Sequence, residues 1–182
     1  MPTPLPEVRS VLQRAQNNRM VLQQLLDTVP ADRWENRADG DAWTAHIHLA
    51  HLATIDTLTM ELLREPGVEG FSLDQQLQVQ RTALISELAD QPVPDLRAAM
   101  DESRDRLWRH VAAFDPEWLA QPVIVERPGH HPPRQSLSLR AYLASWAEHD
   151  LEHAEAIRAA ITVSIQPGAL SAAARVRKQR GS

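Results

Sequence analysis

The sequence predicts an all-α protein in which four long helices pack as a bundle. Two observations support this fold class. Aromatic and β-branched residues are sparse, whereas Leu, Ala, Gln, Arg and Glu, which favour helix, are abundant. Long segments also repeat apolar residues every three or four positions, the period of a helix with one buried face. A bundle buries all of these faces against one another.

The first two helices have clear start and stop signals. The first is expected over residues 7–29, where Pro30 ends it. The second is expected to begin after Thr44, whose hydroxyl suits an N-cap. It should continue to residue 64, because the turn-forming pair Pro66-Gly67 follows.

The third part of the bundle is expected in two pieces. Residues 72–89 have a helical pattern, which Pro92 and Pro94 interrupt. Asp95 is then expected to cap a further helix with a regular apolar face. The fourth long helix is expected over residues 138–162.

Two segments depart from the helical pattern. The proline-rich excursion over residues 121–135 precedes the last helix, and Val123 and Val125 alternate there with polar positions. A short extended pair and irregular structure are both compatible with it. One domain is expected over residues 1–165, followed by a basic, flexible tail over 166–182. The tail suits a solvated terminus better than an arm for nucleic acid or anionic lipid.

Composition excludes several kinds of chemistry. The absence of cysteine excludes disulfides, thiolate zinc sites and a cysteine nucleophile. Lys178 is the only lysine, which argues against a Schiff base or a phosphate-loop lysine. The net charge of −5 implies no general affinity for nucleic acid. With no signal-peptide pattern and no long apolar run, a cytoplasmic protein without a membrane partner is expected.

Histidines are the residues most able to support a reaction. His149 and His153 are four residues apart, so they share a face of the last helix, about 6 Å apart along its axis. His51 lies on the apolar stripe of the second helix. Ordinary hydrogen-bonded core histidines are one interpretation. The other is a metal site of His51, His149 and His153, because a shared ion would partner all three buried rings. Such ligands suit zinc, nickel, cobalt or iron(II), and leave a coordination position open.

The other five histidines are weaker candidates. His48 is three residues before His51 and is expected at the boundary of the helix face, as an edge ligand or supporting group at most. His46 should face solvent, and His110 lies off the apolar stripe of its helix. His130 and His131 are expected in an exposed turn, with the mouth of a pocket as the alternative.

Four short motifs together give the sequence a family resemblance. These are VPADRW at 29–34, DAWT at 41–44, HLA at 51–53 and EHDLEH at 148–153. With this order and spacing, residues 7–161 resemble the DinB/YfiT family of damage-inducible, metalloenzyme-like four-helix bundles. In the related mycothiol-dependent isomerases a carboxylate often takes the first position of the last pair. Here that position is His149, which favours the DinB-like branch, although Glu148 is adjacent.

The resemblance implies a fold and a class of reaction. It implies an up-down-down-up bundle, a nickel or zinc ion near one end, and frequent homodimers. Some members of the family are metal-dependent S-transferases that use bacillithiol, mycothiol or glutathione. A thiol S-transferase acting on a small electrophile is therefore the leading hypothesis. The alternatives are a metal-dependent hydrolase of small molecules and a non-enzymatic, stress-related metal-binding protein.

Individual catalytic residues are not singled out by the sequence. Asp150 and Glu152 are candidates to accept hydrogen bonds from the imidazoles. Arg81 and Arg104 are candidates to contact a carboxylate of an anionic thiol. A charge on a solvated helix face is the competing interpretation for all four.

Overall fold

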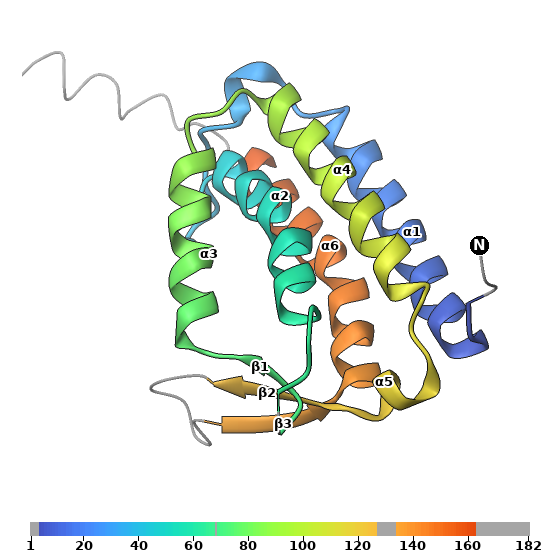
Figure 1. Ribbon diagram of the computed structural model, residues 1–182. Coiled ribbons are helices and arrows are strands. Elements are labelled where there is room, and N and C mark those ends of the chain that lie inside the picture. The colour runs from blue at the N-terminus through green and yellow to red at the C-terminus, as the bar shows by residue number, and fades with distance from the viewer. Residues whose placement is uncertain (1–3, 68, 127–133, 163–182) are drawn as a thin grey trace, which may run out of the picture.

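The computed structural model describes residues 4–67, 69–126 and 134–162. Within those ranges the chain forms six α-helices, one short 3₁₀ helix and three short strands (Figure 1). The helices are α1 (Pro6–Leu26), η1 (Ala31–Arg33), α2 (Ala45–Leu62), α3 (Gln75–Leu88), α4 (Val93–Val111), α5 (Pro116–Ala120) and α6 (Leu139–Thr162). The strands are β1 (Phe71–Leu73), β2 (Pro122–Glu126) and β3 (Arg134–Ser138).

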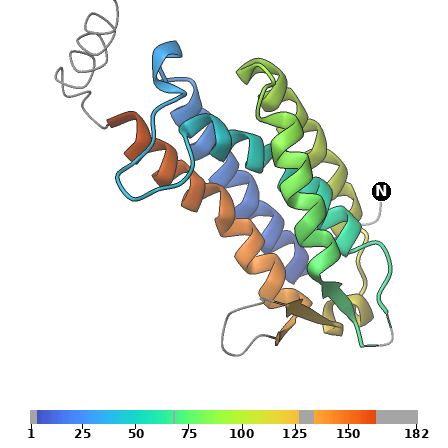
Figure 2. The ribbon, with the colours of Figure 1, turned by 90° about the vertical axis from the view of Figure 1, so that its left-hand side faces the viewer.

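Four of the helices form the predicted bundle. α1 packs along α6, α2 packs along α4, and α2 also contacts α6 (Figures 1 and 2). In Figure 1, α1 and α6 run upward and α2 and α4 run downward, which is the up-down-down-up arrangement. α3 lies outside this core against α2, and it links the two parallel helices. The predicted fold class is confirmed.

The helix boundaries differ from the predicted ones in three places. The first helix ends at Leu26, and the residues expected to extend it lead into η1. The predicted break between two helical pieces is present, because α3 ends at Leu88 and α4 begins at Val93. Pro92 and Pro94 lie at the start of α4, since a first turn does not need the amide hydrogen that proline lacks. The expected cap at Asp95 is therefore one of the first helical residues.

The other correction concerns the start of α3. Residues 71–73 form a strand, where a helix was expected from residue 72. The Asp74 side chain then caps α3 by accepting a hydrogen bond from the Leu77 amide at 3.0 Å. The predicted cap of α2 is present, because the Thr44 hydroxyl accepts from the Ile47 amide at 3.2 Å.

A small sheet closes one end of the bundle. β1 pairs in parallel with β2, and β2 pairs antiparallel with β3, so that Val123 lies opposite Leu137. Of the two structures compatible with the proline-rich segment before α6, the short extended pair is therefore the one observed. Gly70 has a φ of 106°, and a Cβ there would lie 2.2 Å from the Pro122 carbonyl oxygen. Only glycine allows β1 to approach β2 so closely.

Two apolar clusters form the core. One includes Leu12, Leu107 and Leu143 and extends to the sheet. The other includes Leu49 and Ile157 and lies toward the opposite end of the helices. The bundle is therefore apolar at both ends of its interior, with His51 in the first half of α2 and His149 and His153 near the middle of α6.

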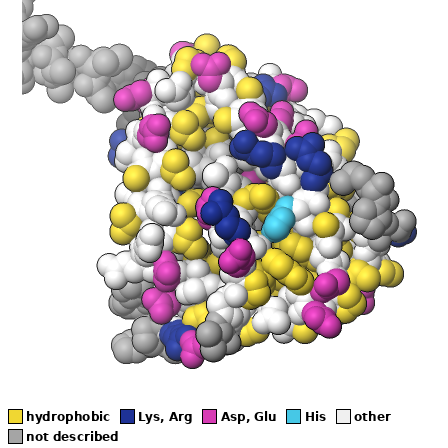
Figure 3. All heavy atoms as spheres, in the orientation of Figure 1, with side chains coloured by type: hydrophobic (Ala, Val, Ile, Leu, Met, Phe, Trp, Pro, Cys, Tyr) yellow, Lys and Arg dark blue, Asp and Glu magenta, His cyan; other side chains and the backbone are white. Residues whose placement is uncertain are grey.

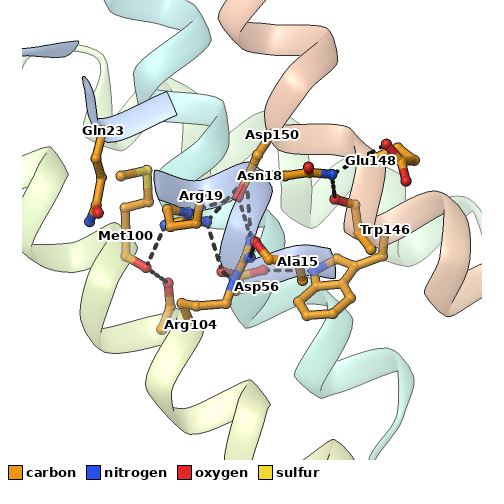
Figure 4. Close-up of polar contacts among 12 residues, drawn as sticks. Ala15, Asn18, Arg19, Gln23, Asp56, Met100, Arg104, Trp146, Glu148 and Asp150 are labelled. Atoms are coloured by element: carbon orange, nitrogen blue, oxygen red, sulfur yellow. Dashed lines mark hydrogen bonds and ion pairs between the residues drawn. The ribbon is translucent and has the colours of Figure 1, made fainter. Parts of the chain in front are cut away.

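Between the two apolar clusters lie four buried charged side chains, one from each bundle helix. This buried charge cluster consists of Arg19, Asp56, Arg104 and Asp150, which point toward one another in Figure 4. Arg19 Nε lies 2.8 Å from Asp150, and Arg104 Nε lies 2.7 Å from Asp56. The Trp146 indole donates a further hydrogen bond of 2.8 Å to Asp56.

Two residues of this cluster, Arg104 and Asp150, were expected to contact a ligand or an imidazole instead. Arg104 is not available to contact a thiol carboxylate, because it is buried between Asp56 and Asp150. Burial by itself would lower the pKa of Arg104, but the two carboxylates outweigh burial and raise it. Asp150 accepts from Arg19 and Arg104, and not from an imidazole.

The surface is mixed in charge. On the face shown in Figure 3, acidic and basic side chains are interspersed among apolar ones. Of the helices described, none is both long enough and apolar enough to cross a membrane.

Candidate metal centre

α2 and α6 bring three histidines together. His51 lies in the first half of α2 and is 3% exposed, and His149 and His153 lie one turn apart on α6. The His51 ring centre lies 5.0 Å from that of His149 and 4.7 Å from that of His153. One ring nitrogen of each residue lies within 4.8 Å of those of the other two.

The spacing and donor type fit a metal ion. His51 Nε2 lies 3.2 Å from His149 Nε2. Two nitrogen ligands about 2.0–2.1 Å from a tetrahedral ion are about 3.4 Å apart, so these atoms need hardly move to share one. The Nδ1 atoms of both residues are buried and have no hydrogen-bond partner within the described structure. The chain itself therefore leaves both rings incompletely satisfied.

The environment keeps all three rings uncharged. Burial, followed by repulsion from His149, Arg81 and His48 whenever these carry a positive charge, lowers the pKa of His51 to about 3. Burial and the neighbouring imidazoles lower the pKa of His153 to about 2. Burial also lowers the pKa of His149. At neutral pH each ring keeps a nitrogen lone pair, which is the form that binds a metal.

These shifts predict that acid destabilises the metal-free protein. The pKa of His51 is about 3 in the folded chain and 6.5 when unperturbed. Protons therefore bind the unfolded state first as the pH falls below 6.5. The free energy of unfolding should decrease by up to about 1.4 kcal/mol per pH unit for this residue. Urea unfolding of chelator-treated protein between pH 7 and 4.5 should show this slope, and His51→Gln should reduce it. Equal slopes in the two proteins would contradict the prediction.

A second pair of side chains orients His153. His48 Nδ1 lies 2.8 Å from His153 Nδ1, and His48 Nε2 lies 3.0 Å from Asp41 Oδ2. Asp41 also accepts from the Trp43 amide, and that hydrogen bond is the main reason why its pKa is lowered. An ionised carboxylate can only accept, so His48 Nε2 carries a hydrogen and donates it.

The tautomer of His153 follows from this arrangement. A neutral His48 with its hydrogen on Nε2 has a lone pair on Nδ1, which accepts from His153 Nδ1–H. The lone pair of His153 is then on Nε2. We call Asp41 and His48 the orienting pair. A carboxylate that fixes the tautomer of a metal-binding histidine through hydrogen bonds is common in metal sites.

The orienting pair was only partly foreseen. His48 is buried, although a boundary position was expected, because it lies between Asp41 and His153. Asp41 precedes α2 in a loop, so no helical spacing could connect it with His48. The DAWT motif at 41–44 was the available signal, since it contains both Asp41 and the cap of α2.

Trp43 lies against the histidines and opens onto a cleft. Its ring centre is 5.2 Å from those of His48 and His51 and 6.1 Å from that of His153. The adjoining cleft lies between the start of α2 and α3 and has a volume of about 450 Å³. It is lined by Trp43, Ile47, Arg81, Thr82, Ile85, Ser86 and Ala89.

The remaining sequence candidates do not belong to the three-histidine group. His46 is half-buried and not surface-exposed as expected, because its Nε2 lies 3.0 Å from the Gln91 carbonyl oxygen. His110 Nε2 donates to the Leu63 carbonyl at 2.9 Å. Glu152 is exposed. His130 and His131 lie outside the described residues.

Comparison with known proteins identifies the fold. The family model of the DinB superfamily matches residues 14–157. A crystal structure of a mycothiol-dependent maleylpyruvate isomerase superposes with a TM-score of 0.66 at 16% identity, covering 84% of this chain. This chain spans only 61% of that isomerase. YfiT from Bacillus subtilis, described as a "probable metal-dependent hydrolase", superposes with a TM-score of 0.59 at 14% identity, and 83% of each chain is covered. No protein of curated function matches.

Proposed function

Because this chain belongs to the DinB superfamily, we propose that His51, His149 and His153 hold a divalent transition metal in a thiol-dependent enzyme. The reaction proposed is transfer of a low-molecular-weight thiol to a small electrophile. The observation that carries this proposal is the convergence of three uncharged imidazoles from two helices, one of them buried and two half-buried. Zinc and nickel suit such ligands best, and iron(II) and cobalt are compatible with them.

The charge of the site favours a thiolate. Three neutral imidazoles leave the charge of a dication uncompensated, so an anionic outside ligand would be attracted to it. A metal bound there would lower the pKa of a thiol enough for its thiolate to form at neutral pH. The chain has no cysteine, so the sulfur has to come from a second molecule.

The residues around the histidines have positioning roles in this reaction. The orienting pair holds the His153 lone pair on Nε2, and Trp43 packs against His51 and His153. The cleft beside Trp43 has room for a small electrophile. In the transfer, the thiol loses its proton to water and a sulfur–carbon bond forms. The leaving group departs with the electrons of the bond that breaks.

Two other functions compete with this one. Water activation at the same site would give a hydrolase, as the description of YfiT suggests for that protein. A hydrolase needs a free general base, and the nearby carboxylate of Asp41 is already engaged by His48 and the Trp43 amide. A purely structural metal site usually has four protein ligands. The group found within the described ranges has three.

Cobalt-loaded protein allows a direct test. Adding mycothiol, bacillithiol or glutathione should shift its visible spectrum, and the active thiol should react with 1-chloro-2,4-dinitrobenzene faster with metal-loaded than with metal-free protein. His46→Ala is a matched control on α2, because His46 does not belong to the three-histidine group. Ester hydrolysis without any thiol, together with an unchanged spectrum, would overturn the proposal in favour of a hydrolase.

The orienting pair gives a more specific prediction. Asp41→Asn should weaken metal binding about tenfold, because the amide no longer fixes the tautomers of His48 and His153. Competition with a chromophoric chelator would measure the affinity. Asp39→Asn is the control, since Asp39 is exposed in the same loop. Equal affinities in the two variants would show that the orienting pair does not support the metal.

A further inference from the structure

Arg81 lies on the wall of the cleft beside the three histidines. It is half-buried on α3, and the structure gives it no hydrogen bond or ion pair to any described residue. The buried arginines of the charge cluster, Arg19 and Arg104, are by contrast each paired with both buried aspartates of that cluster. A partly desolvated guanidinium with no anionic partner is an available binding group.

The rest of the cleft complements this charge. No Asp or Glu is among the residues that line it, within the part of the chain described. Trp43, Ile47 and Ile85 give it an apolar and aromatic wall, and Thr82 and Ser86 contribute hydroxyls. The cleft therefore combines a single positive charge with an apolar surface, which is typical of a site for small organic anions.

The cleft also leads to the proposed reaction centre. Trp43 both lines the cleft and packs against His51, with ring centres 5.2 Å apart. Arg81 lines the same cleft as Trp43. A molecule held at Arg81 thus has its other end close to the histidines.

We propose that Arg81 anchors a carboxylate of the molecule that reacts at the histidine site, with Trp43 and Ile85 contacting its apolar body. This inference rests on the proposed function and specifies its substrate class: a small carboxylate carried by the thiol or by the electrophile. The guanidinium would bind the carboxylate through two parallel hydrogen bonds. Lysine, with a single ammonium group, should replace it only in part.

Two titrations test the proposal and identify which molecule carries the carboxylate. The first adds 3-mercaptopropionate or the uncharged 2-mercaptoethanol to cobalt-loaded protein and follows the visible spectrum. Arg81→Gln should weaken the binding of 3-mercaptopropionate about tenfold and leave the binding of 2-mercaptoethanol unchanged. The second measures the binding of 3-phenylpropionate, which has no thiol, to zinc-loaded protein by calorimetry. Arg81→Lys should bind the carboxylate probes with an affinity between those of the parent protein and Arg81→Gln. Arg109→Gln changes an exposed arginine on α4 and is the charge-matched control.

The outcomes separate this inference from the proposed function. If Arg81→Gln weakens only the binding of 3-mercaptopropionate, the carboxylate that Arg81 anchors belongs to the thiol. If it weakens only the binding of 3-phenylpropionate, that carboxylate belongs to the electrophile. If Arg81→Gln and Arg109→Gln affect every probe equally, Arg81 is not an anchor. If no thiol alters the cobalt spectrum, thiol transfer fails, and the phenylpropionate titration still decides the role of Arg81.

Discussion

Asp56→Ala is expected to lower the free energy of unfolding by about 3–5 kcal/mol, the usual cost of breaking a buried ion pair. The Asp56 side chain is fully buried on α2 and accepts from Arg104, Arg19 and the Trp146 indole. Without it, the two guanidinium groups would share only the carboxylate of Asp150 inside the bundle. Chemical denaturation at pH 7 would measure the change.

A matched aspartate serves as the control for this prediction. Asp101 lies 3.8 Å from Arg19, but its side chain is 54% exposed. Asp101→Ala should cost less than about 1 kcal/mol, because solvent screens exposed ion pairs. The free energy of unfolding of Asp56→Asn should lie between those of the two alanine variants, since the amide oxygen can still accept a hydrogen bond from Trp146. If Asp56→Ala and Asp101→Ala proved equally stable, the buried charge cluster would contribute no net stability to the bundle.

The sequence predicted the bundle because each long helix has one apolar face whose period can be read directly. It predicted the grouping of His51 with His149 and His153 for the same reason, since these residues lie on such faces. Both predictions depend on the spacing of residues along each helix taken separately. The helix boundaries do not follow from this period, because a proline can end a helix or begin one, as Pro92 and Pro94 show at the start of α4.

The polar interior could not be read from spacing in the same way. Arg19 and Arg104 look like surface residues in the sequence, because arginine is seldom buried without a partner. Their partners Asp56 and Asp150 lie on other helices, far away along the chain. Asp41 is similar, since only the path of the loop before α2 places it beside His48. Partners from separate elements follow from tertiary packing and have no local signature.

Loss of one histidine of the three is expected to have the largest effect on metal binding. His51→Ala, His149→Ala and His153→Ala should each weaken binding by more than about 100-fold, the upper end of what loss of a mere supporting partner costs. Each removes one of three converging nitrogen donors. Metal analysis of the purified proteins and chelator competition would measure the loss.

Stability measurements distinguish lost ligands from misfolding. A metal that binds only the folded chain raises the melting temperature more, the larger the ratio of free metal to its dissociation constant, so zinc at a fixed concentration should stabilise the parent protein and hardly affect the variants. Without metal, His51→Ala and His149→Ala should melt close to the metal-free parent or above it, because each lacks an imidazole whose buried Nδ1 has no hydrogen-bond partner in the described structure. His110→Ala provides a histidine control on α4, outside the three-histidine group. Near-stoichiometric metal in all three variants would show that the ion binds elsewhere on the protein.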